Sequence, residues 1–222
     1  MKHIKMIKTK SQSIRKSILK SQSGVVIVEF ALMLPLFVGI TVVGLEYSYF
    51  ALVNMKLNQI AVMAADNASR YTPTMDEADF IDVTAGTNVI GDPIDFNANG
   101  RIILSSLQHN GLTGTNEGQV INWQRCNGNL TSVASQYGVQ GTGASNAVLK
   151  DGVGSPANRI TAISGTAIMF IEVVFDYKPL IAPSFPGSVQ LNRRMRFESA
   201  YIVRSRQNFD ISNTGNITVN NC

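Results

Sequence analysis

The longest apolar stretch of the chain runs from Val25 to Leu45, in the sequence "VVIVEFALMLPLFVGITVVGL". Glu29 is the only ionisable residue in it. As a helix rising about 1.5 Å per residue, the stretch would be roughly 31 Å long, which matches the hydrocarbon thickness of a bilayer. The pattern therefore predicts a membrane-spanning helix over 25–45 that carries one unexplained carboxylate.

A helical pattern continues beyond this stretch. Its apolar positions recur at steps of three and four residues: Phe50, Val53, Leu57, Ile60, Ala61, Ala64 and Ala68. Pro73 is a natural terminator. We expect an amphipathic continuation over 46–71 and one helix of roughly 70 Å in all. Pro35 cannot donate to the Ala31 carbonyl, which predicts a kink there.

The remaining chain alternates apolar and polar residues at the period of strands. Strands are predicted at 100–108, 118–126, 166–179 and 192–205, and 138–158 reads as a long surface loop. Pro179, Pro183, Pro186 and Gly187 lie between the last two strands and favour an antiparallel pair. One face of the third strand would carry Met169, Ile171, Val173, Phe175 and Tyr177. We predict an α+β fold, in which a long N-terminal transmembrane-to-amphipathic helix packs on a small antiparallel β-sheet domain.

Charge is distributed unevenly along the 222 residues, whose formal net charge is +4. Residues 1–24 hold seven lysines and arginines and no acid, so the rest holds 12 basic and 15 acidic side chains, a balance of −3. A basic surface for nucleic acid is therefore not supported. The basic flank predicts a cytoplasmic N-terminus and an exported C-terminal part. The expected organisation is a leader (1–24), a span (25–45), the amphipathic continuation (46–71) and an exported domain (72–222).

Two other interpretations of the apolar stretch were weighed. A buried helix of a soluble protein fits poorly with the length and the basic flank. A cleaved secretory signal requires small residues at its cleavage site, whereas "GLEYSYFALVN" offers bulky ones.

Gly24 followed at once by an apolar helix with glutamate at its fifth position resembles the processing signal of type IV prepilins. The string "GVVIVEFALMLPLF" resembles the TadE-like family, which are minor pilins or pseudopilins of the Flp (tight adherence, Tad) pilus system. The resemblance covers about 23–60, and "IEVVFDYKPL" and "RRMRFESAY" extend it to about 168–206. Pro35 falls where the "VEFAL…P" pattern of the family has its proline.

This resemblance implies that a prepilin peptidase cuts after Gly24 and makes Val25 the new N-terminus. Glu29 would then pair with the N-terminal amine of a neighbouring subunit during assembly. The implied partners are that peptidase, other pilins or pseudopilins, the Tad assembly machinery in the bacterial inner membrane, and the lipid around 25–45. A carboxylate in lipid is costly unless it is paired. The alternative, left open, is that Glu29 stays hydrated at the cytoplasmic boundary and has no role.

Cys126 and Cys222 are the two cysteines of the chain. In an exported domain such a pair is more often bridged than free, and we expect a disulfide between them. Two unrelated buried thiols are the alternative.

Few residues of the sequence are candidates for catalysis or for binding a metal ion. The histidines, His3 and His109, form no recognisable catalytic motif, and we expect neither an enzyme nor a cofactor. Asp95, Asn97 and Asn99 resemble the start of a calcium loop, but Ser106 stands where its glutamate belongs, so an Asx-rich turn is favoured. Asp76, Glu77 and Asp79 are predicted to form the solvated first turn of a short helix. A membrane-anchored binding or sensor module is the second functional hypothesis, and a tethered hydrolase the third.

Overall fold

The computed structural model describes residues 22–181, 193–204 and 208–222. These residues form two compact units, divided between Ser48 and Tyr49. Helix α2 (Gln22–Arg70) passes through both and is continuous through Pro35. The predicted fold class is confirmed, because a long apolar N-terminal helix precedes a small antiparallel sheet.

The sheet of the second unit consists of β2 (Gly100–His109), β3 (Gln119–Asn127), β4 (Ala167–Asp176) and β5 (Arg194–Ile202). Its strand order is β3-β2-β4-β5, and each neighbouring pair is antiparallel. All four strands lie where the alternation predicted them. The proline-rich turn before β5 lies largely outside the described residues.

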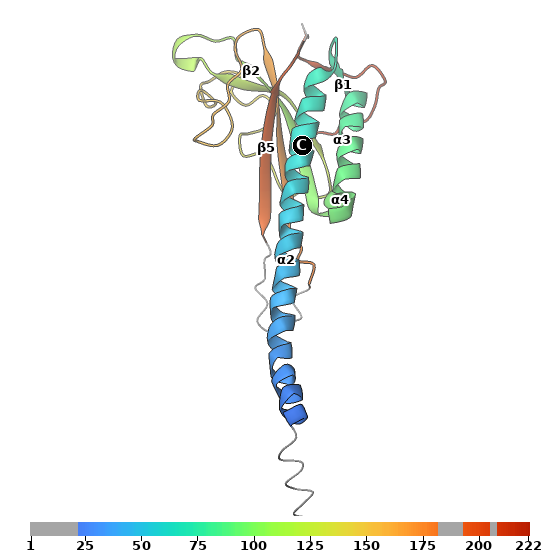
Figure 1. The fold of residues 1–222 in the computed structure, drawn as a ribbon. Coiled ribbons are helices and arrows are strands. Elements are labelled where there is room, and N and C mark those ends of the chain that lie inside the picture. The colour runs from blue at the N-terminus through green and yellow to red at the C-terminus, as the bar shows by residue number, and fades with distance from the viewer. Residues whose placement is uncertain (1–21, 182–192, 205–207) are drawn as a thin grey trace, which may run out of the picture. The chain divides into compact units, whose positions relative to one another are not determined.

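One face of this sheet packs against the second half of α2 (Figure 1). The helix contributes Val53, Leu57, Ile60, Ala61, Ala64, Ala65 and Ala68, all fully buried. The strand β4 contributes the predicted face, Met169, Ile171, Val173, Phe175 and Tyr177. The apolar face of the helix and the apolar face of the strand therefore form one core.

A second helix, α3 (Glu77–Gly91), lies beside α2 and adds Phe80 and Val83 to the same core (Figure 1). Asp76 caps it, because the Asp76 carboxylate accepts from the Ala78 N–H and the Asp79 carboxylate accepts from the Asp76 N–H. Such a reciprocal capping box satisfies backbone donors that a helix start leaves unpaired.

Short elements complete the unit. They are β1 (Met75–Asp76), the 3₁₀ turns η1 (Asp92–Ile94) and η2 (Gly114–Asn116), the single turn α4 (Phe96–Asn99) and β6 (Ile211–Ser212). Strand β6 pairs with β1 in parallel.

The opposite face of the sheet is covered by the long connection between β3 and β4. Leu149 and Val153 of this connection are buried with Leu107, Ile121 and Phe170. The prediction of a surface loop over 138–158 was therefore wrong in part. Its many glycines and polar residues indicated turns correctly, but two apolar side chains anchor those turns in a second core.

Residues 208–222, the C-terminal strap, cross β3 and end beside it. The Trp123 Nε1–H donates to the Phe209 carbonyl at 2.8 Å, and the Cys126 N–H donates to the Asn220 carbonyl at 2.9 Å. These bonds satisfy polar groups along an edge of the sheet, which an edge strand otherwise leaves open.

Candidate functional site

The predicted processing site lies in the first turns of α2. The helix begins at Gln22, so the Gly24–Val25 peptide bond has helical geometry. A Cβ at Gly24 would meet no atom within 4 Å. The fold itself therefore does not require glycine at this position.

The apolar side chains that follow are exposed to the surroundings of the chain. Val25 is 57% exposed and Leu32 is 73% exposed. Within the described residues, α2 is the one helix whose length and apolar character would allow it to cross a membrane, and its most apolar window is not buried at all. An uncovered apolar surface of this size needs lipid or other protein around it.

Glu29 lies one turn after Val25, and residues four apart share a helix face. In the described part of the chain its carboxylate has neither an ion pair nor a hydrogen bond. Thr41, the other polar side chain of the apolar stretch, donates its hydroxyl to the Phe37 carbonyl at 2.8 Å. Glu29 thus differs from Thr41, because Glu29 carries a charge that its own helix does not satisfy.

Pro35 lies inside α2, and the backbone is helical on both sides of it. The kink expected at Pro35 stays a prediction.

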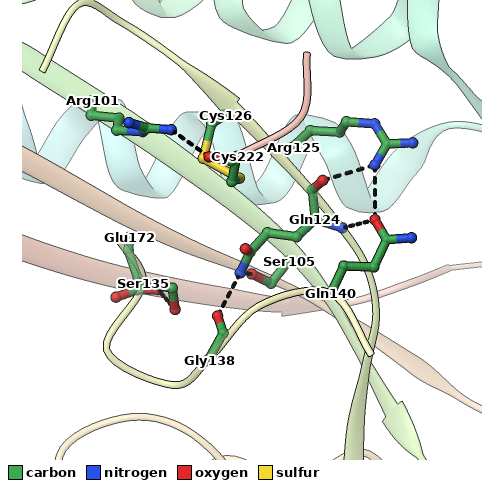
Figure 2. The surroundings of a disulfide bond; sticks show 10 residues. All are labelled: Arg101, Ser105, Gln124, Arg125, Cys126, Ser135, Gly138, Gln140, Glu172 and Cys222. Atoms are coloured by element: carbon green, nitrogen blue, oxygen red, sulfur yellow. Dashed lines mark hydrogen bonds between the residues drawn. A yellow bond between two sulfur atoms is a disulfide. The ribbon is translucent and has the colours of Figure 1, made fainter. Parts of the chain in front are cut away.

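Cys126 and Cys222 are joined by a disulfide in the structure, with their Cα atoms 5.0 Å apart and a sequence separation of 96. Figure 2 shows the Arg101 guanidinium directed at Cys222, whose carbonyl accepts from Arg101 Nη2 at 3.3 Å. Arg101 is buried, and this burial lowers its pKa. The disulfide attaches the C-terminal strap to β3.

Glu77 is not the solvated residue that its acidic neighbours suggested. It is 3% exposed, and its carboxylate accepts from Arg125 Nε at 2.8 Å and from Arg125 Nη2 at 2.6 Å. Arg125 Nη1 also donates to the side chain of Gln140 at 3.1 Å (Figure 2). The alternation along β3 was one signal that Arg125 is buried, because Arg125 lies on the same face of the strand as the buried Trp123. The correction is that this acid joins α3 to the sheet.

Glu172 is fully buried on the face of β4 that turns away from α2. Its carboxylate accepts from the Ser135 hydroxyl, from the Gln136 N–H at 3.1 Å and from the Arg196 guanidinium. Burial raises the pKa of Glu172. Ser135 and Gln136 belong to the β3–β4 connection, and Arg196 belongs to β5. Their bonds to Glu172 therefore hold this connection to the sheet.

Tyr137 and Glu198 extend this polar cluster, because the Tyr137 hydroxyl donates to Glu198 at 2.8 Å. Burial raises the pKa of Tyr137 to about 12, with the neighbouring Glu198 contributing. The tyrosine therefore stays protonated throughout the physiological range and donates a hydrogen bond to the carboxylate.

The calcium-loop residues form a capped turn. Asp95 has a left-handed backbone (φ 53°) just before α4, and the Asn99 amide donates to its carboxylate at 3.0 Å. The Asn97 carbonyl accepts from the Asn129 N–H at 3.0 Å. Among the described residues, no group of three or more histidines, cysteines, aspartates or glutamates is placed to hold a metal ion.

His109 lies at the end of β2. Its Nδ1 accepts from the Gly111 N–H at 3.0 Å, and its Nε2 is 3.5 Å from Glu117. These contacts shape the turn between β2 and β3.

Comparison with known proteins identifies the N-terminal segment. Residues 24–66 match the family model described as TadE-like protein. No curated protein and no solved structure matches the chain. The resemblance is thus confirmed over 24–66, and the resemblance over 168–206 stays a prediction.

Proposed function

We propose that this chain, whose residues 24–66 match the TadE-like family model, is a minor pilin or pseudopilin that takes part in assembling Flp (Tad)-type pili. The observation that carries the proposal is where the match begins. It starts at Gly24 and includes Val25 and Glu29, the residues of the expected processing and assembly signal.

The proposed processing step is hydrolysis of the Gly24–Val25 bond by a prepilin peptidase on the cytoplasmic side of the membrane. It removes seven positive side chains and creates one α-ammonium at Val25. That ammonium arises on the helix face that carries Glu29. Processing would therefore supply a positive charge close to Glu29, which has no such partner among the described residues.

The proposed assembly step is an ion pair between Glu29 of one subunit and the Val25 amine of a neighbour. In lipid, a paired carboxylate is much less costly than a lone one. The pairing would favour one axial register between adjacent helices. If Glu29 instead stays hydrated at the cytoplasmic boundary, it would favour no particular register between the helices.

The proposed location is the bacterial inner membrane, with residues 25–45 as a single span and 72–222 outside the cytoplasm. An exported location agrees with the disulfide, which persists in oxidising compartments. The second unit would present its surface to other pilins and to the assembly machinery. A structural role is proposed, with no enzymatic activity.

The alternative function is an exported binding or sensor module held by an uncleaved signal anchor. The N-terminus of the membrane-bound protein separates the two. Mass spectrometry of that protein should find Val25 as its first residue. A chain that retains its leader would contradict the pilin proposal and support the anchor.

Two variants sharpen this experiment. Gly24→Val should remain uncut, although a side chain at this position meets no atom of the fold. Glu29→Gln should be cut and inserted normally but should fail to co-assemble into sheared pili. Unchanged pili from Glu29→Gln would refute the assembly step while leaving the processing step intact.

A further inference from the structure

The second unit has two distinct ends, which α2 defines. At one end Tyr49 and Phe50 of α2 pack their rings against Tyr177, with centroids 6.0 and 5.3 Å away. At the other end the Arg204 N–H donates to the Ser69 carbonyl at 3.1 Å. The twenty residues between Tyr49 and Ser69 span about 30 Å of helix. The Tyr177 end, here called the near end, follows directly after the apolar stretch.

The near end carries unmatched positive charge. The Tyr177 N–H donates to the Arg193 carbonyl at 3.1 Å, which brings Lys178 and Arg193 together at the same end of the sheet. Both residues are exposed, and within the described residues neither has an acidic partner. Arg194, by contrast, is paired with Asp176 at 2.7 Å.

An exposed apolar side chain accompanies these cations. Leu180, two residues after Lys178, is 60% exposed. Leucine and basic side chains in this combination are typical of the membrane–water interface.

We propose that the near end of the second unit rests on the bilayer surface, with Lys178 and Arg193 binding anionic phospholipid headgroups and Leu180 inserting at the acyl boundary. The inference depends on the proposed span over 25–45. Leu45 is only four residues before Tyr49, which is about 6 Å along a helix. The proposed span would therefore keep lipid headgroups within reach of these residues.

The second unit offers a matched control for a test. Ile202 is also 60% exposed, and it lies on the same strand pair at the Ser69 end. Leu180→Trp and Ile202→Trp therefore place an indole in equally exposed positions at opposite ends. Trp123 is buried in the core and contributes the same background to both variants.

The full chain carrying each variant is reconstituted in vesicles of phosphatidylcholine and phosphatidylglycerol with brominated acyl chains. Bromine should quench the fluorescence of Leu180→Trp strongly and leave that of Ile202→Trp unchanged. Adding Lys178→Ala and Arg193→Ala should lower the lipid-contacting population about fivefold for each cation removed, which corresponds to about 1 kcal/mol. Omitting phosphatidylglycerol should have a similar effect.

Equal quenching of the two tryptophan variants, or quenching insensitive to both cations, would overturn the inference. Resistance to alkaline extraction reports insertion of 25–45 separately. An inserted chain without quenching at position 180 refutes the surface contact alone. A chain that does not insert refutes both the contact and the span. The pilus role is tested independently by the mature N-terminus.

Discussion

At the scale of single residues, this fold depends on charges that it buries. Glu77 and Glu172 are almost inaccessible, and each is bonded to an arginine from another element. Removing one member of such a pair leaves the other as an uncompensated charge in a medium of low dielectric. The exposed pair between Arg194 and Asp176 has no such consequence, because solvent screens it.

Glu77→Leu should lower the free energy of unfolding by about 3–5 kcal/mol, because Arg125 would remain buried and unpaired. The double variant Glu77→Leu/Arg125→Met should recover much of this loss. Chemical denaturation of the full chain in detergent measures both. As a control, Arg194→Ala should cost no more than about 1 kcal/mol. Additive losses in the double variant would show that the pair is not coupled.

At the scale of elements, the two halves of α2 differ in what surrounds them. Its first half exposes apolar side chains on all sides, while its second half buries one face in the sheet core and exposes the other. Leu57 is fully buried, whereas Met55 on the opposite face is 63% exposed. The helix is therefore a structural part of the second unit from Tyr49 onward.

Leu57→Ala should destabilise the second unit by about 2–5 kcal/mol, through lost burial and the cavity left behind. Met55→Ala, two residues away on the same helix, should change stability by no more than about 0.5 kcal/mol. Thermal unfolding followed through the fluorescence of Trp123 distinguishes them. Similar shifts in both variants would argue against the packing of α2 on β4.

At the scale of the whole molecule, the chain closes the second unit with its own C-terminal strap. Hydrogen bonds attach the strap to Trp123 and Cys126, and the disulfide fixes its last residue. Asp76 contributes as well, because its carboxylate accepts from Ala78 at the start of α3 and from the Thr214 N–H at 2.9 Å. These bonds, that from Thr214 foremost, lower the pKa of Asp76 to about 2.

The variant Cys126→Ser/Cys222→Ser should lose about 4–5 kcal/mol of stability, because a loop of roughly a hundred residues is no longer closed in the unfolded chain. The denaturant midpoint should fall accordingly, and reduced wild-type protein should show the same fall. A midpoint that does not move would mean that the strap is held by its hydrogen bonds alone.

Local sequence patterns predicted most of the elements. The alternation in 166–179 identified the face of β4 that meets α2, and the three-and-four spacing from Val53 to Ala68 identified the facing side of the helix. Both patterns are visible locally, because each element must turn its apolar side toward the core. Gly24 and Glu29 were recognised in the same way, as a short local signal.

The sequence by itself therefore determined the long apolar helix, the strands and the composition of the main core, whereas the processing signal stays a prediction. Only the tertiary structure decided which distant segments meet. Glu77 appeared solvated because its partner Arg125 lies 48 residues away. Leu149 appeared to belong to a surface loop because the sheet face beneath it is built from other strands. The near end, where Tyr177 bonds to the Arg193 carbonyl and packs against Tyr49, likewise exists only once β4, β5 and α2 have packed. Periodicity records how one segment faces its surroundings, whereas the identity of those surroundings depends on contacts that no single segment encodes.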